Sequence, residues 1–309
     1  MLLPDIAEDL RMTVDELRLA VVKGGTQVKI YRINKSKGGQ RRIFVAPKPI
    51  RAVQYWLIAN VLRGIKIHPA ASAYFPKASI VKNASSHKSG NFFVRLDIEN
   101  FFPSISVDDF FGALEFVGQS DAVKKLLASR DDSELVSCVG YRGKCATGYP
   151  ITPYISNIVM AETDRKIQQA LEERIDDFGA ATYTRYADDM VISIENRGFK
   201  GEVVETVRDI VEASELGSFK LNDGKTRFAS RAAGTATVTG IRICRDGRLT
   251  LHRSYKDHVR LLFSLAAKNK LSPSEMGSLL GHLYHCRAID SNFYNNLLAK
   301  HLDLIQKLK

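Results

Sequence analysis

Cysteine is scarce in this chain of 309 residues, and its four cysteines form no CxxC pair. They are Cys138, Cys145, Cys244 and Cys286. A zinc site or a disulfide framework needs cysteines at short, regular spacings, so neither is expected. Internal repeats, low-complexity tracts and proline-rich linkers are also missing, and the parts of the chain are therefore expected to pack directly against one another.

Long apolar runs are absent as well. No stretch approaches the roughly 18 apolar residues of a membrane-spanning helix. The opening residues, MLLPDIAEDL, are acidic where a signal peptide would be basic. We therefore expect a cytoplasmic protein without a membrane partner.

Acidic residues are outnumbered, with 34 Asp and Glu against 45 Lys and Arg, which gives a net charge of +11. Such an excess favours a polyanionic partner, either nucleic acid or an anionic membrane surface, and charge alone does not choose between them. Between Ile241 and Lys309 lie twelve basic and five acidic residues, so +7 of this charge belongs to the last part of the chain. This part is the expected nucleic-acid clamp.

Helix and strand signals alternate along the chain, and with 45% hydrophobic residues it can bury a sizeable core. Thr13 with Glu16, and Ser272 with Glu275, have the spacing of a capping box at a helix start. One long helix is expected over 155–175, and the region 108–127 is expected to be largely helical. Apolar and β-branched segments predict strands at 28–33, 41–46, 91–98, 181–187 and 190–196. The predicted class is therefore mixed α/β.

Two adjacent aspartates, Asp188 and Asp189, stand at a tight turn between two predicted strands. Like charges at such a turn repel each other and lose hydration, which favours a bound cation. Asp97 ends another predicted strand, and three carboxylates on neighbouring strands would suit two Mg²⁺ ions about 4 Å apart. The alternative is a plain hairpin turn, and the chain's other adjacent acidic pairs are expected to be solvated.

Several motifs resemble those of reverse transcriptases, in the same order and with similar spacing. YADD (186–189) is similar to the family's metal-binding hairpin, and RLDIENFFPSI (95–105) to its first catalytic motif. Three further elements match, namely RRIFVAP (41–47), GYPITPYISNI (148–158) and LNDGKT (221–226). NASSH (83–87) and VTG (238–240) resemble the two signatures of the bacterial retron group, so the matched region spans about residues 41–240.

The chain departs from the family at one point, because Ala146 and Thr147 precede Gly148 where a Pro-Gln pair is usual. Threonine is shorter than glutamine and has no amide. The template or nucleotide contact that the family's glutamine makes is therefore not carried over.

The resemblance implies a right-hand polymerase with fingers, a ferredoxin-like palm and a helical thumb. The fingers would comprise residues 1–90 with a further segment at about 119–145, the palm 91–240 and the thumb 241–309.

The resemblance also implies roles for individual residues. Asp97, Asp188 and Asp189, with the Ile98 carbonyl, would hold two Mg²⁺ ions, and Lys225 would protonate the leaving pyrophosphate or hold the last palm turn. The dNTP would be bound by six residues: Arg41, Arg42, Asn100, Phe101, Phe102 and Gly148. Phe102, five residues after Asp97, would exclude the ribose 2′-hydroxyl.

RNA contacts are expected from two regions. Asn83 and His87, in the NASSH element, would organise structure or contact the cognate RNA. Arg253, Lys256 and Arg260, at spacings of three and four, would align on one helix face along a phosphate backbone. An ordinary solvated face has the same spacing.

The implied activity is that of a bacterial retron reverse transcriptase. Such an enzyme uses dNTPs to copy part of a structured noncoding RNA (msr-msd) into covalently branched single-stranded DNA (msDNA), commonly beside an effector protein in antiphage defence. The alternatives are another bacterial reverse transcriptase, such as a group II intron maturase, a viral-type RNA polymerase, or a noncatalytic RNA-binding scaffold with a polymerase-like palm.

Overall fold

The computed structural model describes residues 2–34, 38–117 and 120–308. Residues 35–37, between the first two predicted strands, lie outside them, as do residues 118–119 of the region expected to be helical. Among the helices in these ranges, none combines the length and the apolar character that a membrane span requires.

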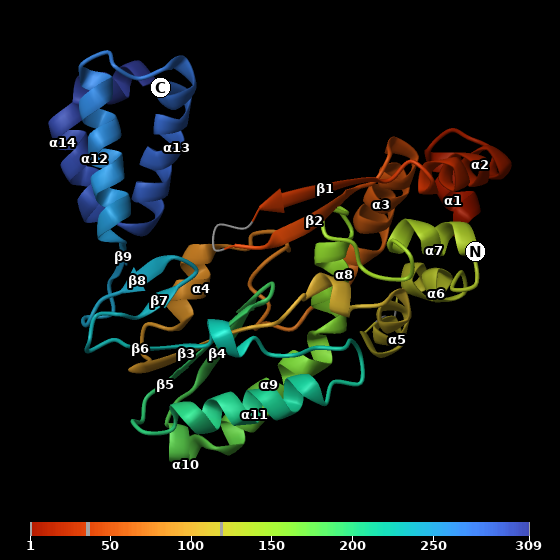
Figure 1. Ribbon diagram of the computed structural model, residues 1–309, viewed down its shortest axis with the longest axis horizontal. Helices are drawn as coiled ribbons and strands as arrows, with labels where there is room; N and C mark the ends of the chain where they lie inside the picture. Colours follow the sequence, from red (N-terminus) through yellow and green to blue (C-terminus); the bar gives the residue numbers. More distant parts are fainter. Residues whose placement is uncertain (1, 35–37, 118–119, 309) are drawn as a thin grey trace.

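The N-terminal part joins a helical cluster to a β-hairpin. The helices begin with α1 (Leu3–Asp9) and α2 (Val14–Gly25), whose predicted capping box between Thr13 and Glu16 is present. The hairpin consists of β1 (Lys29–Asn34) and β2 (Gln40–Val45), and it is followed by α3 (Lys48–Asn60), the 3-10 helix η1 (Leu62–Gly64) and α4 (Ile80–Ser86). The hairpin extends away from the helical cluster (Figure 1).

A later stretch of chain returns to this cluster. It contains α5 (Val107–Val117), α6 (Asp121–Leu127) and α7 (Ser133–Val139), and α7 packs against both α2 and α3. The buried Gln54 amide of α3 donates a hydrogen bond of 2.8 Å to the Cys138 carbonyl of α7. The two segments therefore share one core although about eighty residues separate them.

The centre of the molecule is a four-stranded antiparallel sheet. Its strands are β3 (Phe92–Asp97), β4 (Thr182–Tyr186), β5 (Asp189–Ile194) and β6 (Arg227–Ser230), in the spatial order β4-β5-β3-β6. Helices α9 (Ala161–Glu173) and α11 (Lys200–Glu212) lie together on one face of the sheet (Figure 1). This βαββαβ arrangement is the ferredoxin-like topology expected of the palm.

The helix predicted over 155–175 is wrong in one respect, because the chain bends at Met160. The structure has α8 (Thr152–Val159), α9 and the short α10 (Ile175–Phe178) in its place. The bend lets α8 pack against α5 while α9 packs against α11. The segment that periodicity predicts as one helix therefore forms separate helices, and these cover two different surfaces.

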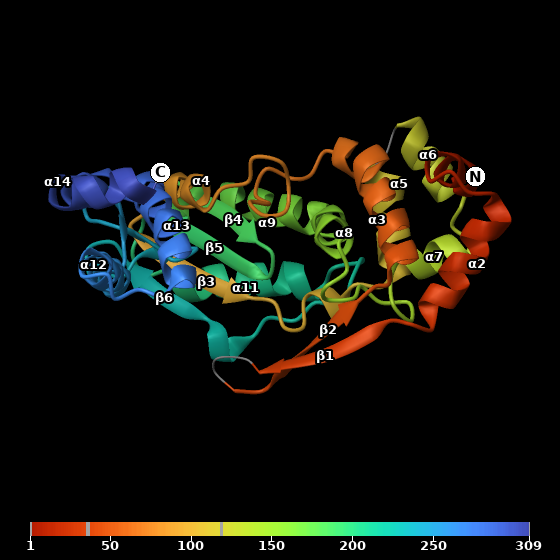
Figure 2. The same ribbon diagram turned by 90° about the horizontal axis from the view of Figure 1, so that it is seen from above.

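The C-terminal part has its own core. It contains a small sheet of β7 (Thr237–Val238), β8 (Ile241–Ile243) and β9 (Leu249–Leu251), followed by α12 (Arg253–Ala267), α13 (Pro273–Ile289) and α14 (Ser291–Leu308), which bends at His301. The predicted capping box of Ser272 and Glu275 begins α13. Figure 2 shows these helices at the opposite end of the molecule from α2 and α7. The observed mixture of helices and sheets confirms the predicted fold class.

Candidate active site

A buried ion pair holds the turn that carries Asp188. Arg185, the residue before the last of β4, is fully buried, and its Nη2 lies 2.7 Å from a carboxylate oxygen of Asp164 on α9. Its Nη1 also donates to the carbonyl of Ala187 at 3.2 Å. Ala187 has a φ of +60°, a conformation that costs energy for a non-glycine residue, so this bond helps to fix the strained turn.

Backbone pairing brings Asp97 to the same place. Asp97, the last residue of β3, lies directly opposite Asp189 of β5 in the antiparallel register, so both side chains project from one face of the sheet. The Ile98 amide donates to the Asp188 carbonyl at 3.0 Å, and the Asn222 amide donates to the Asp97 carbonyl at 2.8 Å. Three chain segments are therefore joined around the carboxylates.

Each of the three carboxylates has a different electrostatic environment. The Lys225 ammonium lies 2.7 and 2.9 Å from the two carboxylate oxygens of Asp97, and Nε of Arg95 lies 2.5 Å from Oδ1 of Asp189. Burial raises the pKa of Asp188, and the nearby charge of Asp97 raises it further. Burial also raises the pKa of Asp189, and the Arg95 hydrogen bond partly opposes this shift.

The donor set fits a divalent cation, although no cluster of three or more His, Cys, Asp or Glu side chains in the described parts of the chain is already arranged around a metal position. Lysine and arginine cations stand beside Asp97 and Asp189. Partial burial, and then repulsion by the charge of Asp97, keeps Asp188 from ionising easily. Carboxylate oxygens are the ligands that hard divalent cations prefer. A divalent ion would relieve this repulsion.

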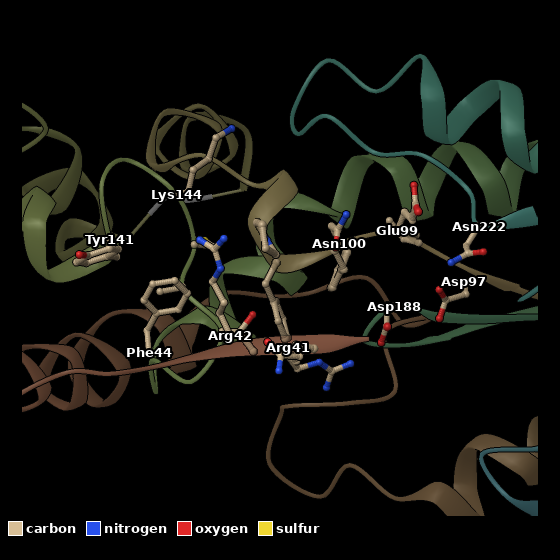
Figure 3. A pocket seen from close by; sticks show the side chains of 18 of the residues that line it. Arg41, Arg42, Phe44, Asp97, Glu99, Asn100, Tyr141, Lys144, Asp188 and Asn222 are labelled. Carbon is tan, nitrogen blue, oxygen red and sulfur yellow. The ribbon is translucent and has the colours of Figure 1, made fainter. Parts of the chain in front are cut away.

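A cavity of about 530 Å³ opens beside these carboxylates. Figure 3 shows Asp97 and Asp188 at one end, with Arg41 and Arg42 reaching the cavity from β2. Arg41 is close enough for its charge to lower the pKa of Asp188. An anion in this cavity would lie between arginine cations and a carboxylate-bound metal ion.

Phe101 and Phe102 have different surroundings although they are adjacent. Phe101 is buried, and its ring centre lies 5.9 Å from that of Phe219 in the core. Phe102 begins the 3-10 helix η2 (Phe102–Ser104) and is only partly buried. Asn100 has a φ of +48° immediately before them, and all three residues line the cavity. Of these two rings, that of Phe102 is therefore the more accessible from the cavity.

Gly148 is required by a close approach of two chain segments. Its φ is +106°, and a Cβ atom there would lie 2.6 Å from the Phe44 carbonyl oxygen of β2. The Phe44 amide donates to the Thr147 carbonyl at 2.8 Å. Ala146 and Thr147 line the cavity, whereas Gly148 is not among the lining residues, so its observed role is to pack the loop against β2.

Several cavity residues were not predicted from the sequence. Tyr74 lies in a loop, with a φ of +66°, and its ring centre is 6.4 Å from that of Phe102 and 6.3 Å from that of Tyr186. The other cavity residues that were not predicted include Glu99, Tyr141, Lys144 and Asn222. Arg95 belongs to a motif that was identified, but its bond to Asp189 follows from strand register, which the sequence did not define.

His87 is fully buried and is not placed to contact RNA, contrary to one of the two expectations for it. The ring is fully buried, with Nδ1 2.8 Å from the Ser193 hydroxyl and Nε2 2.8 Å from the Thr184 hydroxyl. Burial lowers the pKa of His87 to about 4. His87 therefore joins α4 to β4 and β5, which agrees with the structural role that was the other expectation.

The two short signature elements pack against each other. The Thr239 hydroxyl of the VTG element donates to the Ile80 carbonyl at the start of α4, at 3.3 Å, and α4 contacts both β7 and β8. Asn83 of α4 is only 3% exposed. These elements therefore form one unit at the junction of the central sheet and the C-terminal part.

The predicted basic face of α12 is largely engaged with acidic partners. Lys256 lies 2.6 Å from the Asp290 carboxylate and 2.7 Å from the Thr250 hydroxyl, so it stabilises the C-terminal core. Its RNA contact stays a prediction. Arg253 and Arg260 both pair with Asp257, at 3.7 and 2.6 Å, and their side chains stay largely exposed.

The sequence was also compared with protein families and with known proteins. A family model described as "Reverse transcriptase (RNA-dependent DNA polymerase)" matches residues 33–263. The chain is 34% identical over 294 residues to the Retron Ec73 reverse transcriptase of Escherichia coli, covering 93% of this chain and 90% of that protein. It is 30% identical over 287 residues to the Retron Ec83 reverse transcriptase of the same species, covering 89% and 87%.

Among solved structures, the chain is similar to a telomerase from Candida albicans in complex with a fragment of telomeric RNA. The identity is 12% and the TM-score is 0.49, with 91% of this chain and 59% of that chain covered. The apo telomerase from Candida tropicalis, truncated from its C-terminal domain, gives 12% identity and a TM-score of 0.48, with 78% of this chain and 61% of that chain covered. The chain thus spans about three fifths of the telomerases that it matches.

Proposed function

Because the chain belongs to the reverse transcriptase family, within its retron group, and is an RNA-directed DNA polymerase, we propose that it copies part of a cognate structured noncoding RNA into covalently branched msDNA. The observation that carries this proposal is the meeting of Asp97, Asp188 and Asp189 beside a cavity that two arginines also reach. A triphosphate and a pair of metal ions need this combination of charges.

Asp97 and Asp188, with the Ile98 carbonyl, would hold two Mg²⁺ ions, and Asp189 would hold one of them or tune its geometry. When bound, such ions activate an attacking hydroxyl and neutralise the triphosphate. Lys225 would leave Asp97 and donate a proton to the departing pyrophosphate, since an ammonium close to phosphate is a suitable general acid. Its bond to Asp97 supports this role by placing it beside the carboxylates.

The incoming dNTP would lie in the cavity with its phosphates against Arg41 and Arg42. Phe102 would contact the sugar and exclude a ribonucleotide, with Asn100 and the backbone of Phe101 beside it. Gly148 would act indirectly, because it keeps the loop of Ala146 and Thr147 close to β2.

The fingers would comprise residues 1–90 with the segment at about 119–145, the palm residues 91–240 and the thumb residues 241–309. Arg253 and Arg260 of the thumb would follow a phosphate backbone, and Asn83 would contact RNA near the palm. The protein would act in the bacterial cytoplasm, with an effector protein, in antiphage defence.

The nucleic acid that copurifies with the protein tests this proposal. Treatment with RNase, DNase and debranching enzyme, followed by sequencing, should reveal DNA joined through a 2′-5′ bond to a structured RNA. Primer extension on an RNA template, with dNTPs or rNTPs and with or without magnesium, should give magnesium-dependent DNA synthesis. Unbranched products would exclude the retron reaction, and RNA bound without any synthesis would identify a noncatalytic scaffold.

A further inference from the structure

A second cavity, of about 430 Å³, lies between α4, the loop 69–79 and β4. None of the described residues lines both this cavity and the one beside Asp97. The two are nevertheless neighbours, because Tyr74 of the same loop lines the catalytic cavity while Phe75 lines the second one. A strand that leaves the catalytic cavity past Tyr74 would therefore reach the second cavity.

Asn83 is the residue that marks this cavity as a binding site. The residue is 3% exposed, and neither its side-chain amide nitrogen nor its amide oxygen has a hydrogen-bond partner among the described residues. Buried polar side chains are nearly always hydrogen-bonded, so an unpartnered amide that lines a cavity indicates a partner that arrives from outside the chain.

The remaining lining residues define what that partner is. Lys77 and Lys82 contribute two positive charges, and the described lining contains no acidic residue, so the cavity favours an anion. Phe75 is 36% exposed and offers a flat apolar surface. An amide presents adjacent donor and acceptor groups that match the edge of a nucleobase, while aromatic and basic side chains receive its face and its phosphate.

From this lining we infer that the cavity binds one unstacked nucleotide of the RNA strand. The Asn83 amide bonds to the edge of the base, the ring of Phe75 covers its face, and Lys77 and Lys82 contact the phosphate. The inference rests on the proposed function, which supplies the RNA. The position of the cavity is consistent with a path for RNA. Figure 1 shows α4 on the face of the sheet opposite α9 and α11, between the hairpin and the C-terminal helices.

Photo-crosslinking of single-stranded RNA to the full-length protein tests the inference. Oligonucleotides that carry one 4-thiouridine at successive positions are irradiated with the protein, and the crosslinked peptides are identified by mass spectrometry. We expect crosslinks within residues 75–86. Asn83→Leu, which keeps the size of the side chain and removes both polar groups, should lower this crosslink by about tenfold, as loss of a bidentate base contact predicts.

Two exposed lysines provide a second variant that leaves the core intact. Lys77→Ala with Lys82→Ala should weaken RNA binding more than Lys23→Ala with Lys66→Ala, which removes the same charge from exposed sites outside the cavity. Crosslinks that fall only outside 75–86, or that persist unchanged in both cavity variants, would overturn the inference. Thermal unfolding of each variant identifies any that fail to fold.

Competition distinguishes two sources of the nucleotide. If excess mononucleotide removes the crosslink, the cavity binds free nucleotides, and the assignment to the RNA strand is wrong. If only RNA competes, the strand is the occupant. Primer extension by the unaltered protein runs in parallel, so failure of the polymerase proposal appears there, whereas failure of this inference appears only in the crosslinks.

Discussion

Arg95 and Asp189 are diagonal neighbours on the adjacent strands β3 and β5, with Nε of the arginine 2.5 Å from Oδ1 of the carboxylate. The Asp189 side chain is 16% exposed and that of Arg95 is 49% exposed. Asp97 is paired instead with Lys225, and Asp188 forms no ion pair with any described residue. The three carboxylates therefore differ in their ion-pair partners, and substitutions of these partners should have different effects.

Replacing both turn aspartates separates chemistry from folding. Asp188→Asn with Asp189→Asn should reduce DNA synthesis by about a hundredfold or more, because the carboxylates that would hold the metal ions are lost. Folding and RNA binding should persist, since burial already disfavours the charged forms. Primer extension and RNA-binding titration measure the two effects, with Glu172→Gln and Glu173→Gln on the surface as the charge-matched control. Retained synthesis would falsify the metal assignment.

Arg95→Ala should shift the pH dependence of synthesis. The arginine bond opposes the rise in the pKa of Asp189, so its removal lets that pKa rise further. Activity that needs ionised Asp189 is lost as pH falls through this pKa, so the acidic limb should move to higher pH. Stability should change by less than about 1 kcal/mol, because the pair is partly exposed to solvent.

The pH profile of kcat measures this shift, and Arg95→Lys should restore part of it. Arg227→Ala is the matched control, since Arg227 lies opposite Arg95 on β6. Equal shifts in both variants would show a general loss of positive charge instead of a specific bond.

Phe102→Ala should relax the choice of sugar. Its ring lines the cavity and faces Tyr74, so its loss leaves room for a 2′-hydroxyl. We expect ribonucleotide incorporation relative to deoxynucleotide to rise about tenfold, which corresponds to roughly 1.4 kcal/mol in relative barrier height. Single-nucleotide incorporation kinetics give the ratio, with Phe116→Ala, an exposed phenylalanine of α5, as control. An unchanged ratio means that another residue sets the preference.

The basic residues of α12 should divide into two groups. Lys256→Met leaves the buried Asp290 carboxylate without its cation and should lower the free energy of unfolding by roughly 3 kcal/mol. Lys268→Met changes an exposed lysine directly after α12 and should leave the free energy of unfolding unchanged. Arg253→Ala with Arg260→Ala should instead reduce the slope of log Kd against log salt by up to about 2 for RNA. Chemical unfolding and RNA titrations at several salt concentrations separate the groups.

His87 should make the fold sensitive to acid. Burial lowers its pKa to about 4 from an ordinary value near 6.5, so the folded state favours the neutral ring. The unfolded chain takes up a proton as pH falls below 6.5, and stability is lost between that pH and about 4. The full loss is about 3 kcal/mol.

Unfolding measured at several pH values tests this expectation. His87→Gln should be less stable at neutral pH and should lose less stability on acidification. A wild-type loss that matches that of the variant would exclude His87 as its origin.

The local pattern of residues was sufficient for several elements of this protein. The capping boxes at Thr13 and Ser272 begin helices as predicted, because their geometry depends on residues three positions apart. The strands around Asp97 and the YADD turn also follow from apolar runs bounded by turns. The family resemblance added the order of the motifs and hence the carboxylates to consider.

Tertiary structure alone decided which side chains meet. Strand register places Arg95 on Asp189, and the return of residues 220–225 to β3 places Lys225 on Asp97. Burial makes His87 an internal contact instead of the expected RNA contact, since its partners Ser193 and Thr184 come from distant strands of the chain. Folding also pairs Lys256 with Asp290, directly after α13. Sequence specifies the chemistry that each side chain can offer, whereas long-range packing determines which partner removes it from water.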